Sequence, residues 1–250
     1  MMNNEDIKIY VVMHKKFNLK GLKLPAIYEN ILVGNNDKCV VTDSTGDNIS
    51  YKNKNYCELT ALYWIWKNSK SRIVGLCHYR RFFLAPFYYR PFNENEILKV
   101  LNNYDIIVPN KYPVITDNIY NDYKEKHISS DLDICREIIK KKYPDYLSSF
   151  DEFMMCDYYS PYNMFICKKE LIDNYCVWLF DILFELEKRI DLSERDNYQK
   201  RVFGFLAERL FNVWIRKNNL RKFNSFILCT EDPLKYRLKI RFKQKFKKIN

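Results

Sequence analysis

The chain has 250 residues, of which 47% are hydrophobic and 16% aromatic, and its formal net charge at pH 7 is +11. This content excludes an intrinsically disordered chain and is sufficient for one sizeable core, so we expect a single large domain. The 5 glycines are scattered, which excludes the Gly-rich phosphate loops of P-loop and dinucleotide-binding proteins.

The positive charge is concentrated at the C-terminal end. Residues 235–250 contain eight basic residues and no acidic one. Apolar residues recur there at helical spacing, namely at Leu234, Leu238, Phe242, Phe246 and Ile249. The pattern predicts a domain over residues 1–230 followed by a basic amphipathic helix over residues 231–250, which is suited to an anionic membrane surface. A solvated tail, or one docked on its own domain, is the alternative.

Nucleic acid is not an expected partner, because the remainder of the chain has no spread basic face and no recognised binding motif. The 8 cysteines form no C-x-x-C pair and most lie in apolar stretches, so we expect reduced thiols in the core. No leader peptide and no run of about 18 apolar residues is visible. We therefore expect a cytoplasmic protein, held peripherally at the inner face of the membrane by its tail.

Strands and helices are predicted to alternate. Short apolar, β-branched runs predict strands over residues 7–13, 73–77, 105–109 and 163–167. Helical periodicity predicts helices over residues 55–68, 93–103, 130–142, 146–153, 170–190 and 196–217. Such alternation is typical of an α/β fold with a mostly parallel sheet flanked by helices.

Two of these helices begin with the spacing of a capping box. The patterns are Asn55-x-x-Glu58 and Asn93-x-x-Glu96, in which the first side chain caps the helix and the second returns the bond. We therefore interpret Glu58 first as a capping residue. Residues 110–126 have no clear period, and a long irregular segment inside a compact domain is typical of a lid or a binding loop.

Candidate ligand-binding residues follow the predicted strands. In α/β folds ligands bind at the carboxyl ends of the strands, which places His14, residues 78–81 and residues 109–112 along one rim. Lys15 follows His14 directly and adds a cation. A lone histidine such as His14 is also compatible with a purely structural role.

The segment Gly75-Leu-Cys-His-Tyr-Arg-Arg-Phe82 carries the clearest chemistry. Arg80 and Arg81 present forked donors that match phosphate oxygens and stay charged at any relevant pH. With His78 and Tyr79 beside them, they predict a site for a diphosphate. The alternative is a structural clamp in which both arginines pair with buried acids.

Asp47 and Asn48 lie in a short polar segment before the helix that contains Glu58. Short polar side chains of this kind bind ribose or sugar hydroxyls, yet the same composition makes an ordinary turn. Both interpretations remain open at this stage.

The helix over residues 196–217 contains the best candidate for a general base. Arg201, Glu208 and Asn212 fall on one narrow polar stripe of an otherwise apolar helix. A carboxylate in such surroundings either pairs with an arginine or has its pKa raised toward the range of a general base. Asp157, before the strand with Asn163, is the competing base.

No clear cluster of metal ligands is visible in the sequence, so a divalent metal stays an open alternative without a motif to support it. The 3 histidines are far apart, and the Asp131-Leu-Asp133 triplet falls at a predicted helix start, where acids favour the helix dipole.

Blocks of the sequence resemble the DUF4422 family. They lie at residues 9–15, 46–50, 55–68, 75–82, 163–166, 175–183 and 204–210. The resemblance implies a glycosyltransferase of capsular polysaccharide, exopolysaccharide or O-antigen synthesis with a GT-A-like, Rossmann-related fold. The basic tail lies outside it.

The resemblance also implies partners and roles. The donor would be a UDP-sugar carrying a hexose such as galactofuranose or galactopyranose, and the acceptor a lipid-linked oligosaccharide. Many GT-A enzymes hold Mn²⁺ or Mg²⁺ with an Asp-x-Asp motif at a strand end, where this chain has residues 78–81. Arginine would then replace the metal, Glu208 or Asp157 would be the base of an inverting transfer, and Asn163 and Arg201 would contact sugar or acceptor. A non-catalytic protein that binds sugar nucleotide or polysaccharide is the alternative.

Overall fold

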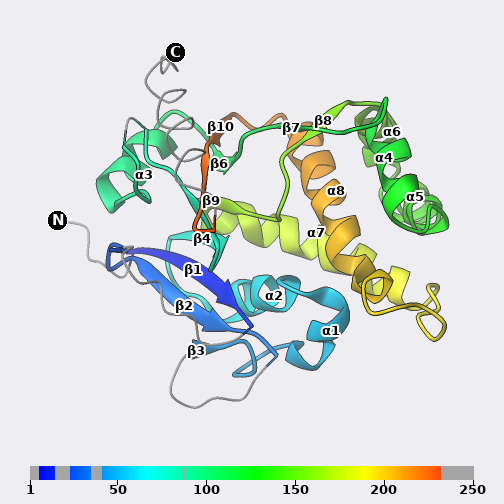
Figure 1. Cartoon of the computed structure of the whole chain (residues 1–250), viewed down its shortest axis with the longest axis horizontal. Helices are drawn as coiled ribbons and strands as arrows, with labels where there is room; N and C mark the ends of the chain where they lie inside the picture. The colour runs from blue at the N-terminus through cyan, green and yellow to red at the C-terminus, as the bar shows by residue number, and fades with distance from the viewer. Residues whose placement is uncertain (1–5, 15–22, 35–40, 87, 232–250) are drawn as a thin grey trace.

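The computed structural model describes residues 6–14, 23–34, 41–86 and 88–231. These residues form a central sheet with helices packed on both of its faces (Figure 1). Lys15 and the predicted basic helix lie outside the described residues, so the expectations for both stay predictions.

The strands and helices have the following bounds. The strands are β1 Ile7–Met13, β2 Tyr28–Leu32, β3 Val41–Thr42, β4 Ile73–His78, β5 Arg81–Phe83, β6 Ile106–Pro109, β7 Tyr112–Pro113, β8 Tyr158–Tyr159, β9 Phe165–Lys168, β10 Lys222–Ser225 and β11 Ile227–Cys229. The α-helices are α1 Asn53–Tyr56, α2 Leu59–Asn68, α3 Glu94–Leu101, α4 Ile119–Lys126, α5 Ser130–Lys142, α6 Leu147–Met154, α7 Lys169–Glu187 and α8 Val202–Lys217. Short 3₁₀ turns are η2 Ser50–Lys52, η3 Pro144–Tyr146 and η4 Gln199–Arg201.

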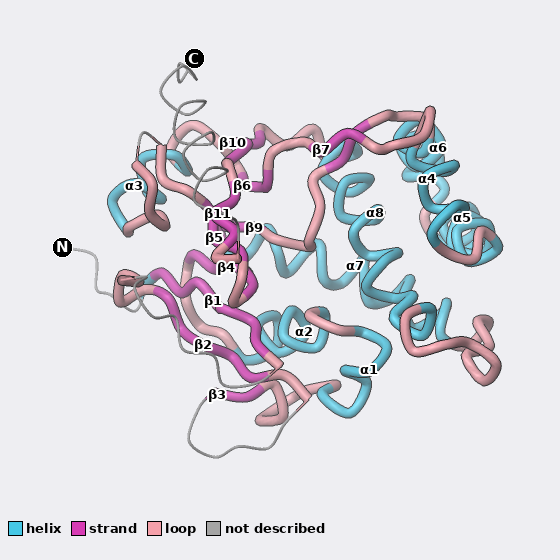
Figure 2. The backbone as a smooth tube through the Cα atoms, viewed as in Figure 1, coloured by secondary structure: helices cyan, strands magenta, loops and turns pink. Residues whose placement is uncertain are grey.

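The main sheet has the strand order β10-β6-β9-β4-β1-β2-β3 along its principal path. Every neighbouring pair on this path is parallel except the two pairs that β9 makes with β4 and β6. Of the described strands on this path, only β9 therefore runs against the others. Figure 2 shows how these strands lie within the sheet. The predicted α/β class, with a mostly parallel sheet flanked by helices, is confirmed.

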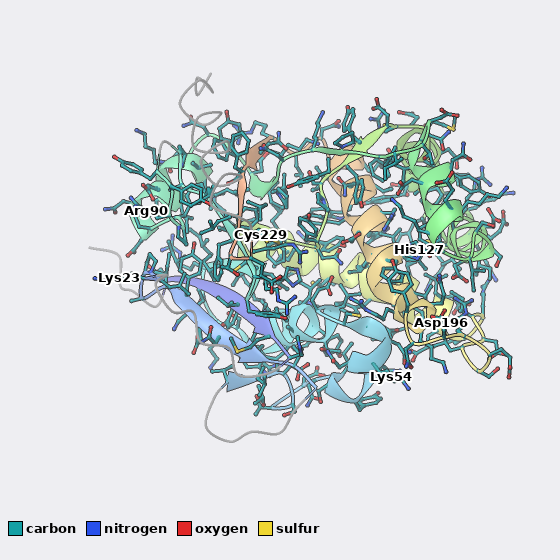
Figure 3. The ribbon with its side chains drawn as sticks, viewed as in Figure 1. Lys23, Lys54, Arg90, His127, Asp196 and Cys229 are labelled. Atoms are coloured by element: carbon teal, nitrogen blue, oxygen red, sulfur yellow. The ribbon has the colours of Figure 1, made fainter. Side chains whose placement is uncertain are left out.

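The two faces of the sheet carry separate hydrophobic cores, because successive side chains of a strand point to opposite faces. In β4, Val74 and Leu76 belong to the core that contains α2, α7 and α8. Ile73 and Cys77 belong to the core that contains α3 and β5. Side chains fill the space between the sheet and its helices (Figure 3). The sheet is thus buried on both faces, and its strand ends remain available for a site.

The two predicted capping boxes have different outcomes. Asn93 accepts from the Glu96 backbone N–H at 3.0 Å and Glu96 returns the bond to the Asn93 N–H at 2.9 Å, so this box is confirmed. The box at Asn55 is wrong: the Asn55 side chain donates to the Lys200 carbonyl oxygen, and Glu58 makes no side-chain capping bond. Glu58 is thereby free for another role.

Other differences concern element boundaries. The segment expected to be irregular contains α4, whose first turn is capped by Asn118 accepting from the Asn121 N–H at 2.9 Å. The strand expected from residue 163 begins only at Phe165, because Tyr162 and Asn163 have positive φ angles of 77° and 51° that a strand cannot contain.

Candidate functional site

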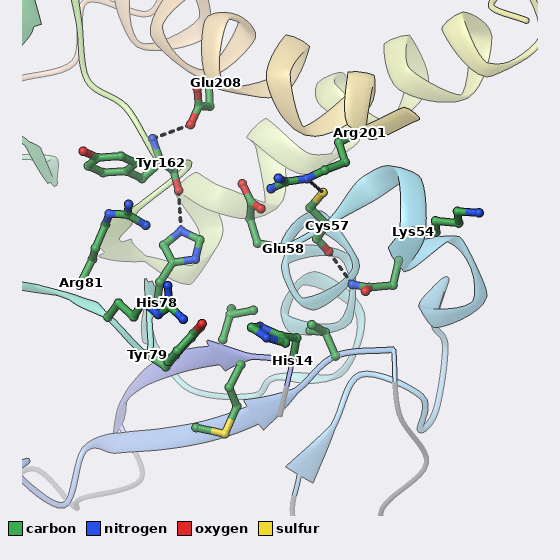
Figure 4. Close-up of a pocket in the computed structure, with 15 residues that line it drawn as sticks. His14, Lys54, Cys57, Glu58, His78, Tyr79, Arg81, Tyr162, Arg201 and Glu208 are labelled. Carbon is green, nitrogen blue, oxygen red and sulfur yellow. Dashed lines mark hydrogen bonds between the residues drawn. The ribbon is translucent and has the colours of Figure 1, made fainter. Parts of the chain in front are cut away.

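A pocket of about 590 Å³ opens at the carboxyl ends of the parallel strands β1 and β4 (Figure 4). Its floor is formed by the end of β1 with His14 and by the β4–β5 connection from His78 to Arg81. The junction of α1 and α2 forms one wall, and Tyr162 with the inner face of α8 lies across from the floor. The predicted position at the strand ends is where the structure has its polar pocket.

Arg80 and Arg81 both line the pocket, but in different surroundings. The Arg81 guanidinium carbon lies 4.4 Å from the centroid of the Tyr162 ring, and Arg81 makes no ion pair with any described residue. Arg80 Nε lies 3.0 Å from Glu231 Oε1, and the two side chains are partly solvent-accessible, at 38% and 53% exposed. A clamp onto buried acids therefore does not explain this pair of arginines.

Tyr162 is held in a strained conformation from two sides. His78 Nε2 donates to the Tyr162 carbonyl oxygen at 2.8 Å, and the Tyr162 N–H donates to Glu208 Oε1 at 2.9 Å (Figure 4). The next residue, Asn163, also has a positive φ, and its amide donates to Glu58 Oε1 at 2.7 Å. Strained backbone of this kind persists where its surroundings over-determine it, which is common at ligand sites.

Glu208 is a partly exposed carboxylate, 19% accessible, on the inner face of α8. Its Oε2 accepts from Arg209 Nη1 at 3.1 Å. Burial raises the pKa of Glu208; the neighbouring Glu58 adds to the rise, while Arg209, the Tyr162 N–H and Arg81 oppose it. The carboxylate is therefore oriented, faces the pocket and takes up a proton more readily than an ordinary glutamate.

Arg209 connects Glu208 to the interior. It is 3% exposed, and its Nη2 lies 3.8 Å from Asp122 Oδ2 of α4. Its guanidinium carbon lies 5.2 Å and 5.1 Å from the rings of Tyr123 and Tyr159. A buried charge network thus links α4 to the pocket carboxylate.

Cys57 and Arg201 form another part of the wall. Cys57 connects α1 to α2 with a φ of 51°, and its Sγ accepts from Arg201 Nε at 3.1 Å. Burial raises the pKa of the Cys57 thiol to about 11, and nearby Glu58 adds to this. The thiol therefore stays protonated at neutral pH, and it orients Arg201 rather than acting as a nucleophile.

The structure places the remaining predicted site residues as follows. His14 and Tyr79 line the pocket and pack edge to face, with ring centroids 5.3 Å apart. Asn163 supports Glu58 from behind the lining.

Three predicted residues are not brought to the pocket. Asp47 accepts from the Tyr63 hydroxyl at 3.1 Å, and Asn48 makes a local turn in which its Oδ1 accepts from the Ser50 N–H at 3.2 Å. Asn48 thus takes part in a turn, and Asp47 contacts α2. Asp157 is exposed beside β8, apart from the lining residues, whereas Glu58 lines the pocket together with Glu208.

Glu58 is the main residue that the sequence analysis assigned to another role. The spacing Asn55-x-x-Glu58 is sufficient to explain Glu58 as a helix-capping residue. In the structure its carboxylate lines the pocket and accepts a hydrogen bond from Asn163, which is 105 positions away in the sequence. No signal in the sequence marks Cys57 or Tyr162 either, because a positive φ at a residue other than glycine depends on its tertiary contacts.

The described side chains contain no ready-made cluster of metal ligands. Among them, no three His, Cys, Asp or Glu residues gather into a group that could ligate an ion. The Asp131 carboxylate accepts both Arg195 Nη1 at 2.6 Å and Nη2 at 2.8 Å, so it is satisfied by an ion pair. In the described part of the chain, no helix has the length and apolarity needed to cross a bilayer.

Fold and pocket define an α/β protein with a cationic, carboxylate-bearing ligand pocket at the ends of its parallel strands. The chain belongs to the DUF4422 family, since the model of that family, a domain of unknown function, matches residues 8–219. This confirms the family predicted from the sequence.

Comparison with solved structures gives a match to WbbM, a bifunctional glycosyltransferase solved in its apo form, with a TM-score of 0.81 and 30% sequence identity. The match covers 91% of this chain and 46% of the WbbM chain, so this chain spans about half the length of that protein. No curated protein matches the chain.

Proposed function

We propose that the protein is a glycosyltransferase that uses a nucleoside-diphosphate sugar as donor. One observation carries the proposal: Arg81, a cation that makes no ion pair with a described residue, and Glu208, a carboxylate whose pKa is raised, line the same pocket. A cation such as Arg81 stabilises an anionic leaving group, and a carboxylate such as Glu208 can act as a base. The structural likeness to WbbM supports the same class of reaction.

The donor diphosphate is assigned to the floor of the pocket. The guanidinium carbon of Arg81 lies 4.4 Å from the centroid of the Tyr162 ring, and this cation–π contact helps to orient its forked donors for phosphate oxygens. Arg80 is 38% exposed and is paired with an exposed acid, which leaves it able to exchange that partner for a phosphate. His14 and Tyr79 border the same space.

Glu208 is assigned as the base of an inverting transfer. It takes the proton of an acceptor hydroxyl, whose oxygen forms a bond to the anomeric carbon of the donor. The bond from that carbon to the diphosphate oxygen breaks, and its electron pair leaves with the nucleoside diphosphate. Fixed cations stabilise the charge that develops on this leaving group, which is the role assigned to Arg81.

Glu58 has a different role in the proposal. One of its oxygens accepts from Asn163 at 2.7 Å, and the carboxylate lines the pocket between the floor and α8 (Figure 4). We assign it to a hydroxyl of the transferred sugar, with Arg201 beside it as a further sugar or acceptor contact.

The finer assignments follow the family resemblance. The donor is a UDP-hexose, with galactofuranose and galactopyranose as the first sugars to test, and the acceptor is a lipid-linked oligosaccharide of a surface polysaccharide. The basic segment 235–250 would hold the protein at the inner face of the membrane, where such acceptors are found.

The test is turnover of a panel of UDP-hexoses, with and without EDTA, followed by UDP release and by product mass. We expect transfer or slow hydrolysis of one donor, and a large loss in Glu208→Gln. Tight binding of UDP with no turnover of any donor would instead favour a non-catalytic protein that binds sugar nucleotides.

A further inference from the structure

A second, smaller hollow lies beside the short β7–β8 sheet. It has a volume of about 190 Å³ and is lined by residues of β8, α8, β10 and the segments next to them. The lining residues include three cations, Lys111, Arg216 and Lys222. No lining residue is acidic. The positive charge of these side chains is therefore not balanced by any acid in the lining of the hollow.

The cations have few partners among the described residues. Arg216 is paired with Glu152, outside the lining. Lys111 Nζ lies 3.8 Å from the centroid of the Tyr158 ring, and neither Lys111 nor Lys222 makes an ion pair with a described residue. Burial lowers the pKa of Lys222, and the charges of Lys111 and Arg216 lower it further. Lys222 is thus a half-buried cation with two further cations beside it, of which only Arg216 is paired with a described acid.

A structural explanation accounts for only part of this arrangement. Arg216 lies in the last turn of α8, where a cation favours the helix dipole. Lys222 lies on β10 and does not share that explanation. A half-buried lysine with no acid partner, beside two other cations, costs stability unless a ligand compensates it.

The wall of the hollow is rigid. Ser160 and Asn212 exchange two hydrogen bonds of 2.9 Å through the Ser160 backbone, and the Ser160 hydroxyl donates to the Pro109 carbonyl oxygen at 2.9 Å. Phe153 and Ile215 line the same space. A hydrogen-bonded wall lined by cations is the arrangement expected of a binding site rather than of a solvated surface.

We propose that this hollow is a second anion site, which binds a phosphate or diphosphate group through Lys111, Lys222 and Arg216. It is separate from the larger pocket but adjacent to it along the chain: Tyr158 lines the hollow and Tyr162 lines the pocket. Their Cα atoms are four residues apart, hence at most about 14 Å. If the protein is the proposed glycosyltransferase, this group belongs to the acceptor; the anion site itself does not depend on that function.

The direct test reads out Lys222 alone. The full-length protein is acetylated with a trace of acetic anhydride, with and without inorganic pyrophosphate at constant ionic strength, and each lysine is quantified by mass spectrometry. We expect pyrophosphate to lower the reactivity of Lys222 about tenfold or more, as binding of a charge-assisted ligand would. Lys99, exposed on α3, is the internal control. Unchanged reactivity of Lys222 at millimolar pyrophosphate overturns the proposal.

A pair of variants keeps the test independent of folding. In an Arg81→Gln background, which weakens the larger pocket as an anion site, Lys222→Met should lower pyrophosphate affinity about tenfold by calorimetry. The same substitution at Lys217, which is paired with Asp145 outside the hollow, should not. Lys222→Met should also melt at the same temperature or higher, since it removes an uncompensated charge. Equal affinities in the two variants overturn the proposal, as does a lower melting temperature for Lys222→Met.

A third arm separates a soluble phosphate group from a membrane headgroup. Vesicles of phosphatidylglycerol and of phosphatidylcholine replace pyrophosphate in the acetylation experiment. Protection by pyrophosphate supports the site as proposed. Protection by phosphatidylglycerol vesicles without protection by pyrophosphate means that the cations face a lipid surface, which overturns it.

Discussion

His78 Nε2 lies 2.8 Å from the carbonyl oxygen of Tyr162, a residue with a φ of 77°. A carbonyl oxygen only accepts, so Nε2 carries the proton, and the end of β4 is tied to the segment that faces it across the pocket. The same tyrosine receives Arg81 on its ring and donates its N–H to Glu208. One hydrogen bond therefore helps to position both the proposed leaving-group cation and the proposed base.

We expect His78→Ala to lower kcat/KM about 100-fold, because small displacements of reacting groups have effects of this size. His78→Gln can return an amide donor to the Tyr162 carbonyl and should recover part of the loss. Steady-state kinetics and thermal melting check this. If both variants lose activity equally while melting like the wild type, the histidine contacts substrate itself and is not a positioning residue.

Arg81→Gln should weaken UDP binding about 10- to 100-fold, the range for losing a charge-assisted hydrogen bond. Arg80→Gln should have a smaller effect, since Arg80 is exposed and already paired with Glu231. Calorimetry with UDP and with uridine provides the control, because uridine has no diphosphate. A similar loss for both ligands would place Arg81 at the nucleoside and contradict the assignment.

Glu208→Gln should lower kcat by about 10² to 10⁴, the usual contribution of a general base. Because burial raises the pKa of Glu208, the acidic limb of the wild-type kcat/KM profile should fall above the ordinary glutamate value of about 4.3. Activity is lost as pH drops through that limb, since the base becomes protonated. The residual activity of Glu208→Gln should lack this acidic limb. If the limb persists in Glu208→Gln, the base is another group, and Glu58→Gln is the next variant to measure.

Glu208 also makes stability depend on pH. Its pKa is higher in the folded than in the unfolded chain, so the folded state binds the proton more tightly. Protonation of Glu208 therefore stabilises the folded state at low pH. This contribution to the free energy of unfolding is lost as pH rises from the ordinary glutamate range through the pKa of Glu208 in the folded state.

Arg209→Gln should move the acidic limb to higher pH, because the Arg209 guanidinium holds the pKa of Glu208 down against burial. It should also lower the melting temperature, since the 1% exposed Asp122 then keeps only Lys126 as its cationic partner. Lys217→Gln, at the exposed end of the same helix, should leave the limb in place. An unmoved limb in Arg209→Gln would show that the guanidinium does not act on the base.

The sequence was sufficient where local rules decide the structure. The capping box at Asn93 and Glu96 forms as predicted, and His78 to Arg81, selected by their position at a strand end, line a pocket, while their binding role stays a prediction. The same capping pattern failed at Asn55 and Glu58, whose side chains instead contact Lys200 and Asn163, more than 100 residues away. Two identical local patterns thus have different outcomes because long-range partners compete with the cap.

The helix α4 was missed for a related reason. It is short and mostly polar, and its buried Asp122 is compensated by Arg209 and by Lys126. The sequence of α4 has no apolar periodicity, because α4 is stabilised in part by a charge network with α8. The position of Asp157, exposed and away from the pocket, likewise depends on how β8 pairs with β7, which sequence spacing does not reveal.

Two glycines provide a matched test of the fold without altering a pocket residue. A Cβ on Gly75, in the centre of the sheet, would lie 2.7 Å from Ile9 Cδ1 and 3.0 Å from the Phe165 carbonyl oxygen. Gly75→Ala should therefore lower the free energy of unfolding by about 1–3 kcal/mol, the usual result of overpacking. On Gly204, inside α8, the nearest contact of a Cβ would be an ordinary 3.7 Å.

Gly204→Ala should accordingly stabilise the protein by about 1 kcal/mol, because alanine is that much better than glycine within a helix. Urea unfolding of both variants at one pH checks the pair. The opposite signs matter more than the sizes, since both substitutions add the same methyl group. If Gly204→Ala were also destabilising, α8 would pack against Cys57 and the α1–α2 junction more closely than the structure has it, and the position of Glu208 relative to Glu58 would have to be revised with it.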